Sequence, residues 1–292
     1  MALEAVFYVA RVVFRPLRRV ALTAWSGVYA GRAVYESLNR AGIVLDRGGL
    51  FRVSPVYPLG SRAPVGGFLA PGERYWFRAV FWGAPGSASG QQLARGLMAG
   101  LGLWTRELVV EELSLEERRA RLPDPGAGEG EADGEPVAAL VRVRHGPTFY
   151  RFHGAVVSYP SPWRLVASIA RRLSLATGID YRPLARRLQP CLELAVDRTR
   201  RVRIRLSHGA EPPVFTGEAL YHAVCPRGLA SALQRLLEAG VYTGAGASPG
   251  LGLGEIHAVD LGPPRHRAPP ALEPWTEEQE EPSGAEKEAR PA

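Results

Sequence analysis

The stretch YTGAGASPGLGLGEI (242–256) is the most informative segment of this 292-residue chain. Its glycines recur at short intervals, at Gly244, Gly246, Gly250, Gly252 and Gly254. A dinucleotide-binding glycine loop follows a strand and opens a helix, and a Walker loop contains a lysine. This stretch has no lysine, and it follows a predicted helix and precedes a predicted strand. It therefore indicates a helix-to-strand loop whose bare backbone amides can approach phosphates, or else a merely flexible loop.

The residues around this loop predict a mixed α+β unit. Apolar residues at helical spacing in PRGLASALQRLLEAG (226–240) predict a helix directly before it. The other expected elements are strands at 137–152, 200–207, 213–224 and 252–259, a helix at 160–178, and a helix or turn-rich stretch at 181–196.

The N-terminal half shows the same order of elements with a different sequence. AVFYVARVVFRPL (5–17) alternates as a strand does, and VYAGRAVYESLNRAG (28–42) has helical spacing with Gly42 as a C-cap. The remaining expected elements are strands at 50–59, 74–82 and 107–113 and a helix at 89–101. Both halves follow the βαββαβ order. We therefore predict an α+β fold of two tandem ferredoxin-like (RRM-like) domains with a C-terminal glycine-rich loop.

Composition indicates where these domains end. Residues 122–136 are rich in glycine, proline and acidic residues, and residues 263–292 have too few apolar side chains to offset chain entropy. The predicted organisation is an N-terminal domain at 1–121, an acidic linker or loop at 122–136, a C-terminal domain at 137–262 and a disordered acidic tail at 263–292.

The formal net charge of +7 is unevenly distributed. Residues 107–135 hold ten acidic residues against three arginines, and residues 271–292 hold seven against two cations, which leaves +19 on the rest. Such a basic surface suits a polyanion, and nucleic acid is favoured over an anionic membrane.

Several classes of protein are disfavoured. The apolar N-terminal segment is interrupted by four arginines, Arg11, Arg15, Arg18 and Arg19. We therefore expect neither a membrane span nor a signal peptide, and a cytoplasmic location. Cys191 and Cys225 are too few for a disulfide framework. Because no histidine or cysteine pair has metal-ligand spacing, we predict no metal site and no cofactor.

The loop pattern G-x-G-x3-G-x-G-x-G, between the last helix and the last strand, resembles the signature of the RAMP superfamily of CRISPR-associated proteins. Other segments are similar to one branch, the endoribonucleases that process CRISPR repeat transcripts, and among them to divergent archaeal members. These segments are LFRVSPVYPLG (50–60), RVRHGPTFY (142–150) and VFTGEALYHA (214–223).

The resemblance implies an endoribonuclease that cleaves CRISPR repeat RNA without a metal ion. The ribose 2′-hydroxyl would attack the scissile phosphate and leave a 2′,3′-cyclic phosphate and a 5′-hydroxyl. Such chemistry needs a base near the 2′-hydroxyl, a cation on the phosphorane and an acid at the leaving oxygen.

The candidate catalytic residues depart from the family pattern. Many members carry a histidine in or just after the first helix, but this chain has none before His145. The corresponding helix offers Arg32, Tyr35 and Arg40 instead. Because arginine is a poor proton donor, these residues favour positioning and electrostatic stabilisation over acid–base catalysis. The competing interpretations assign these residues no catalytic role. Tyr35 would then pack in the core, and Arg32 and Arg40 would lie on a solvated face of the helix.

The candidate RNA-binding residues include an arginine run. Arg201, Arg203 and Arg205 share one face of the predicted strand, at a spacing that matches consecutive phosphates. Charges that protect an exposed edge strand are the alternative. The other predicted contacts are Arg171, Arg172, His145, Gly244, Gly246, Ser248, Gly250 and Gly252. For His145, which lies beside the Pro-Thr motif, the competing interpretation of a structural histidine is favoured over RNA contact.

The predicted function is thus a metal-independent endoribonuclease whose partner is CRISPR repeat RNA. The alternative is a non-catalytic RAMP-type subunit that holds guide RNA within a CRISPR effector complex. The absence of metal ligands and acid–base pairs disfavours a third reading, a ferredoxin-like metabolic enzyme. No membrane partner is expected, and the chain is predicted to be a monomer or homodimer.

Overall fold

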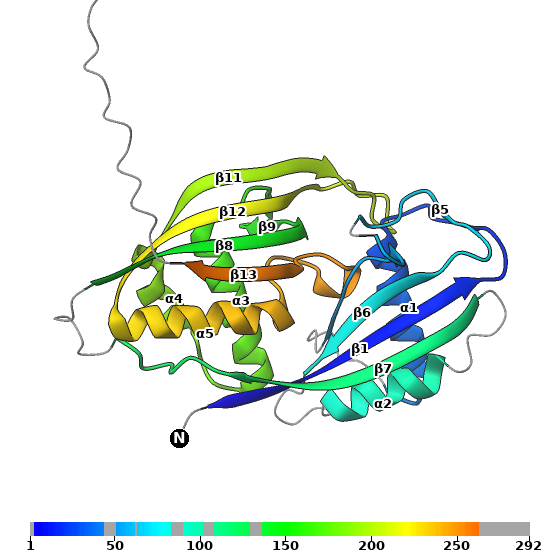
Figure 1. Cartoon of the computed structure of the whole chain (residues 1–292), viewed down its shortest axis with the longest axis horizontal. Coiled ribbons are helices and arrows are strands. Elements are labelled where there is room, and N and C mark those ends of the chain that lie inside the picture. The colour runs from blue at the N-terminus through cyan, green and yellow to red at the C-terminus, as the bar shows by residue number, and fades with distance from the viewer. Residues whose placement is uncertain are drawn as a thin grey trace, which may run out of the picture.

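The computed structural model describes residues 3–43, 51–61, 63–82, 90–101, 108–128 and 136–262. Two antiparallel sheets dominate this part of the chain (Figure 1). The first has the strand order β3-β6-β1-β7, and β4 pairs with β6. Its elements are β1 (Glu4–Pro16), β3 (Phe51–Val53), β4 (Tyr57–Pro58), β6 (Tyr75–Phe81) and β7 (Leu108–Arg121), with helices α1 (Ser26–Arg40) and α2 (Gly90–Leu101).

The second sheet has the order β11-β12-β8-β13. Its elements are β8 (Pro136–Thr148), β11 (Leu192–Arg203), β12 (Pro213–Pro226) and β13 (Ile256–Gly262), with helices α3 (Pro162–Thr177), α4 (Arg182–Leu188) and α5 (Arg227–Thr243) and the 3-10 turn η1 (Gln189–Cys191). Two small ribbons accompany the sheets. They pair β2 (Val20–Ala21) with β5 (Phe68–Leu69) and β9 (Tyr150–Phe152) with β10 (Ala155–Val157).

Both sheets confirm the ferredoxin-like prediction. In each unit the first and third strands of the βαββαβ order lie in the middle, and the second and fourth lie at the edges. The predicted helix termini also hold in α3, where Pro162 lies in the first turn and Gly178 adopts the left-handed C-cap conformation with φ of 74°.

Three predicted strands are corrected. The strand expected at 252–259 is β13, which begins at Ile256 and ends at Gly262. The strand expected at 200–207 is β11, which begins at Leu192 because that residue already pairs with Ala223 of β12, and which ends at Arg203. The strand expected at 50–59 is divided into β3 and β4. Between them the Ser54 hydroxyl accepts a hydrogen bond from the Arg78 amide at 2.8 Å, and Pro55 has no N–H to donate to the sheet.

The charge partition also changes. Residues 108–121 form β7, a full strand of the first sheet, so their acidic residues belong to the folded part. Glu111 there pairs with Arg15 at 3.0 Å and with Arg74 at 2.7 Å. The folded part is therefore less basic than +19. Residues 129–135 of the expected linker, and the tail at 263–292, lie outside the described residues.

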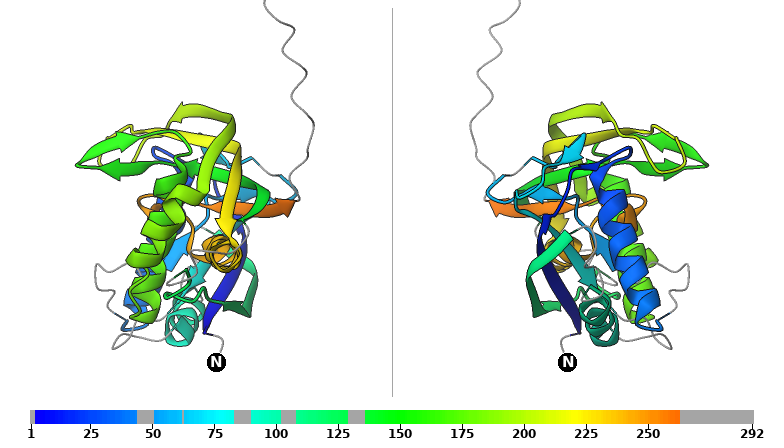
Figure 2. Two further views of the ribbon diagram at one scale, coloured as in Figure 1. Left: turned by 90° about the vertical axis from the view of Figure 1, so that its left-hand side faces the viewer. Right: turned by 90° about the vertical axis from the view of Figure 1, so that its right-hand side faces the viewer.

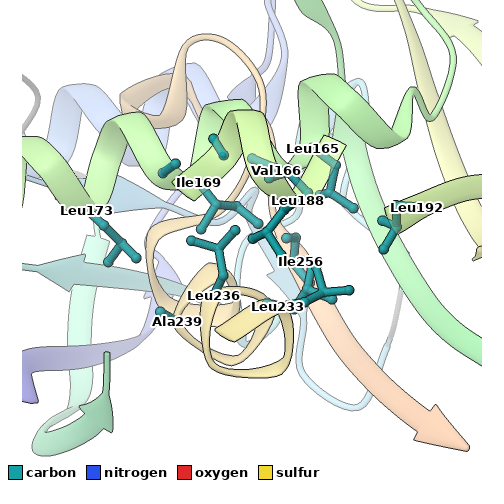
Figure 3. Packing of buried hydrophobic residues seen from close by; sticks show 14 of the residues in the cluster. Leu165, Val166, Ile169, Leu173, Leu188, Leu192, Leu233, Leu236, Ala239 and Ile256 are labelled. Atoms are coloured by element: carbon teal, nitrogen blue, oxygen red, sulfur yellow. The ribbon is translucent and has the colours of Figure 1, made fainter. Parts of the chain in front are cut away.

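One large apolar core joins the two units. Helix α5 lies between the sheets, as its end-on view in Figure 2 shows. Leu233, Leu236 and Ile256 pack there against α3, as Figure 3 shows. Phe7 of the first sheet stacks on Tyr242 of α5 with ring centroids 4.9 Å apart. Because each fully buried leucine or isoleucine contributes roughly 1.5–3 kcal/mol, this shared core holds the units in one arrangement.

Within the described residues, no helix is both long and apolar enough to cross a bilayer. Cys191 and Cys225 are both buried and form no disulfide.

Candidate functional site

The glycine-rich loop lies between α5 and β13 and contains the short 3-10 helix η2 (Pro249–Leu251). Most of its backbone amides already donate within the protein, so the expectation of bare amides is wrong for them. Ala245 donates to the Gly254 carbonyl at 2.7 Å, for example, and Gly246 donates to the Ser168 hydroxyl at 3.1 Å. The donating amides are those of Gly244, Ala245, Gly246, Ala247, Leu251, Gly252 and Gly254. The loop is a braced scaffold rather than a flexible one.

Arg172 braces the loop from the second unit. It lies in α3, is 7% exposed, and donates hydrogen bonds of 2.5 Å to the carbonyl oxygens of Thr243 and Gly246. Burial lowers the pKa of Arg172 to about 9, so the guanidinium remains charged at neutral pH. The structure thus places this predicted RNA contact inside the protein, beneath the loop.

Arg52 of β3 braces the loop from the first unit. Its guanidinium donates to the carbonyl oxygens of Tyr242 and Val241 and lies 3.5 Å from the Glu255 carboxylate. Arg78 of β6 reaches the same carboxylate at 2.5 Å. Burial lowers the pKa of Arg52 to about 10. Burial opposes ionisation of Glu255, but the two arginines outweigh it and lower the pKa of this carboxyl. The three groups form a charged clamp between the units.

The first turns of α1 pack directly against the glycine-rich loop. A Cβ atom on Gly27 would lie 2.7 Å from the Gly252 Cα, and one on Gly31 would overlap the Gly250 carbonyl. Only glycine permits this contact between backbones. The Trp25 indole donates to the Gly252 carbonyl at 3.4 Å. Helix α1 and the loop are therefore held in a fixed relative position.

A cavity of about 780 Å³ opens where α1, the glycine loop and the segment after β11 meet. Its polar lining contains guanidinium, phenol and hydroxyl groups, from Thr23, Tyr29, Arg32, Tyr35, Arg205 and Ser207. Gly250 and Leu251 of the loop form another wall. Three segments that the sequence analysis singled out separately therefore meet in one cavity.

The predicted catalytic residues divide into two groups. Tyr35 is 46% exposed and lines the cavity, so it is not a packed core aromatic. Arg32 also lines the cavity and pairs with Glu36 at 2.6 Å. The hydrogen bond from this pair raises the pKa of Arg32, which keeps the guanidinium charged. Arg40, in the last turn of α1, lies outside the cavity wall.

The predicted arginine run lies along the edge of the second sheet, because β11 is an edge strand. Arg201, Arg203 and Arg205 are exposed, and Ile204 and Leu206 between and after them are buried. Arg205 lies beyond the end of β11, lines the cavity and pairs with Glu211 at 2.8 Å. The position of these arginines at the sheet edge is compatible with RNA contact, and also with protection of the edge strand against pairing with another chain.

The remaining predicted contacts lie at different depths. Arg171 is exposed on α3, and Gly246, Ser248 and Gly250 are partly exposed on the loop, whereas Gly244 and Gly252 are buried. His145 is 1% exposed, lies 3.3 Å from the Tyr221 hydroxyl, and packs edge-on against the Phe215 ring. Burial lowers the pKa of His145 to about 3, so its ring is neutral in the folded protein. Its surroundings are those of a structural histidine.

Several residues that build this site were not predicted from the sequence. Tyr29 lines the cavity and accepts a hydrogen bond from the Thr23 amide at 2.8 Å, and the clamp residues Arg52, Arg78 and Glu255 went unmarked. A signal existed for Arg52 and Glu255, because each is a charged residue within a short apolar segment. Such residues are seldom buried unless they are paired.

The chemistry available in the cavity is electrostatic. Arg32 and Arg205 supply permanent positive charge suited to phosphate, and Tyr35 supplies a hydroxyl that can donate a hydrogen bond. Among the described residues that line the cavity, none is a histidine or a carboxylate. In the described residues, no three histidine, cysteine, aspartate or glutamate side chains cluster so that they could hold a metal ion.

Residues 144–256 match the family model of the CRISPR-associated endoribonuclease Cas6, and this segment includes the glycine-rich loop. Over these residues the match confirms the resemblance to CRISPR-associated endoribonucleases. No curated protein sequence matches the chain.

Solved structures share the fold across both units. A Cas6 product complex is 16% identical, with a TM-score of 0.59 over 87% of this chain and 99% of that one. Thermus thermophilus Cas6 is 17% identical, with a TM-score of 0.51 over 89% and 100%. A Cas6-related protein from Pyrococcus furiosus is 10% identical, with a TM-score of 0.51 over 87% and 98%. At these identities the similarity is one of fold.

Proposed function

We propose that this protein is an endoribonuclease that cleaves CRISPR repeat RNA at the cavity between α1, the glycine loop and the end of β11. One observation carries the proposal: Arg32 and Tyr35, Arg205, and Gly250 line a single cavity although they lie far apart in the sequence. The family model supports the substrate class, because it describes CRISPR-associated endoribonucleases.

The proposed reaction is attack by the ribose 2′-hydroxyl on the adjacent phosphate, without a metal ion. The O2′–P bond forms as the P–O5′ bond breaks, which leaves a 2′,3′-cyclic phosphate and a 5′-hydroxyl. Arg32 and Arg205 stabilise the negative charge that develops on the phosphorane. Tyr35 donates a hydrogen bond to a phosphate oxygen, and solvent exchanges the protons.

The proposed RNA path runs from the cavity along the edge of the second sheet. Arg201 and Arg203 of β11 contact phosphates of an RNA stem, which proteins read mainly through its shape and backbone. Ser248 and Gly250 supply the exposed side of the loop, while Arg172, Gly244 and Gly252 position that loop from below. Arg40 extends the positive surface along α1, and Arg171 does so on α3.

One assay tests this function. Purified protein is incubated in EDTA with an end-labelled repeat RNA and with the same RNA carrying a 2′-deoxy substitution at the cut position. We expect one cut in the first RNA, with a cyclic phosphate end, and none in the second. Cleavage that requires an added metal ion, or that survives the 2′-deoxy substitution, would contradict the mechanism.

A second candidate function is that of a guide-RNA-holding subunit of a CRISPR effector complex. It is supported by the described part of the cavity wall, in which no histidine or carboxylate is present to transfer protons. This reading predicts tight, specific binding of repeat RNA with no cleavage in the same assay.

A further inference from the structure

A second cavity, of about 520 Å³, lies beside the other end of the glycine loop. The hairpin β9–β10 and helix α3 form its walls, and Ser248 and Pro249 of the loop form its edge. None of its described lining residues also lines the cavity of about 780 Å³. The proposed function uses Arg171 and Ser248 of its wall as RNA contacts but assigns no ligand to the cavity itself.

An exposed aromatic ring marks this cavity. Phe152 of β9 is 54% exposed, although burying a phenylalanine ring stabilises a folded protein. The hairpin turn holds it there, because His153 and Gly154 both have positive φ, 46° and 84°, and so form a tight reversal directly after Phe152. The Arg164 guanidinium carbon lies 4.9 Å from the centroid of the Phe152 ring.

Among the described residues that line the cavity, the charged ones are all arginines and none is a carboxylate. Arg164 lies over the Phe152 ring, Arg151 and Arg171 line the cavity with it, and Arg172 is buried in the wall. Arg164 also donates to the Ser161 hydroxyl at 3.2 Å, which fixes its position beside the ring. An exposed aromatic ring in a cavity lined by guanidinium groups complements an aromatic base joined to a phosphate.

We propose that this second cavity binds an unpaired nucleotide of the RNA, with its base stacked on Phe152 and its phosphates held by Arg151 and Arg171. The proposal deepens the proposed function and rests on it only for the identity of the RNA. Gly250 of the loop lines the cavity of about 780 Å³, and Ser248 of the same loop lines the second cavity. Because the two cavities lie this close together, the bound nucleotide belongs to a single-stranded flank near the cleavage point.

The test measures RNA binding by fluorescence anisotropy with a repeat RNA made uncleavable by a 2′-deoxy substitution. Two further RNAs are used, the repeat hairpin without its flanks and an unstructured single strand. Phe152→Ala removes the ring and Phe152→Tyr retains it. Phe68→Ala is the matched control, because Phe68 is 43% exposed with the Arg19 guanidinium carbon 4.1 Å from its ring centroid, in the first unit.

We expect Phe152→Ala to weaken binding of the full repeat and of the single strand by about tenfold or more, as loss of one stacked base does. Phe152→Tyr and Phe68→Ala should bind as the wild type does, and the bare hairpin should bind all four proteins equally. Unchanged binding of the single strand by Phe152→Ala would overturn the proposal, and so would an equal loss on the bare hairpin.

The two proposals can fail separately. If the wild type binds single strands through Phe152 but cuts no repeat, the nuclease proposal fails and the nucleotide site stands. If it cuts the repeat in EDTA while Phe152→Ala binds every RNA normally, the nucleotide site fails alone.

Discussion

The guanidinium of Arg52 lies 3.5 Å from the carboxylate of Glu255, and both side chains are almost completely buried. Arg52 belongs to the first sheet, and Glu255 directly precedes the last strand of the second. This ion pair therefore closes the contact between the two units at the base of the glycine loop. It holds the end of the loop on β3, and α1 packs on the same loop at Gly27 and Gly31.

Removing one partner of this pair should destabilise the whole protein. Glu255→Gln leaves the guanidinium of Arg52 without its carboxylate in a buried site, which typically costs about 3–5 kcal/mol. Urea unfolding followed by circular dichroism measures the change. Asp180→Asn is the control, because Asp180 pairs with Arg182 on the surface, and it should unfold close to the wild-type midpoint. A wild-type midpoint for Glu255→Gln would show that the pair contributes no net stability.

The close packing of α1 on the loop predicts a difference between two glycine substitutions. Gly252 and Gly72 have similar positive φ, 70° and 81°, so an alanine at either costs roughly 1–2 kcal/mol of backbone strain. At Gly252 the new Cβ would also lie 2.6 Å from the Gly27 Cα, whereas at Gly72 it would meet nothing. Gly252→Ala should therefore lower the melting temperature more and reduce RNA cleavage, and Gly72→Ala should leave cleavage intact. Equal effects on both measurements would exclude the close contact as their cause.

The buried neutral histidine predicts how stability depends on pH. The pKa of His145 is lowered to about 3 in the folded protein, whereas an unfolded histidine titrates near 6.5. Between these values the unfolded chain binds the additional proton, so this contribution to stability is complete above about pH 6.5 and is lost as the pH falls toward 3. His145→Gln should show a shallower decline in unfolding midpoint from pH 7 to 4 than the wild type. The exposed His208→Gln should decline as steeply as the wild type, and a parallel decline for His145→Gln would contradict the assignment.

The proposed cleavage mechanism predicts a specific loss of rate. Tyr35→Phe removes a donor that would stabilise the transition state, and Arg32→Gln removes a charge that would do so. Each should slow single-turnover cleavage by roughly 10²–10³-fold, while RNA affinity changes much less. Arg40→Ala, outside the cavity wall, should slow it far less. If both cavity variants cut at the wild-type rate, catalysis occurs elsewhere.

The edge arginines predict a change in salt dependence. If Arg201 and Arg203 each neutralise one phosphate, the double Arg201→Ala, Arg203→Ala variant should bind repeat RNA with a log–log salt slope shallower by about 1.4–1.8. Titrations at several salt concentrations measure it. Arg95→Ala, an exposed arginine on α2, should leave the slope unchanged. An unchanged slope for the double variant would leave protection of the sheet edge as the role of these residues.

Local sequence signals predicted the fold well but missed its strand boundaries. Alternation and helical spacing act over a few residues, so they located the strands and helices of both units. The start of β11 at Leu192 depends on pairing with Ala223, which lies 31 residues further along the chain. The sequence around Leu192 does not contain that information, because backbone pairing is made between strands.

The candidate site was predicted in pieces. Arg32, Tyr35, Arg205 and the glycine loop were each recognised, but that they line one cavity follows from the packing of α5 between the sheets. His145 was a candidate RNA contact because it lies beside the Pro-Thr motif, and Arg172 because it belongs to a cluster of arginines on helices. The structure buries both, because each satisfies groups inside the second unit.

By itself, the sequence determined the ferredoxin-like order of elements, the glycine spacing and the positive composition, because each is a property of neighbouring residues. Only the tertiary structure decided which charges remain on the surface. Arg52, Arg172 and Glu255 are buried and hold the loop, whereas Arg32, Arg201 and Arg205 remain exposed. That division depends on which distant backbone carbonyls and carboxylates come within hydrogen-bond distance once the shared core has formed.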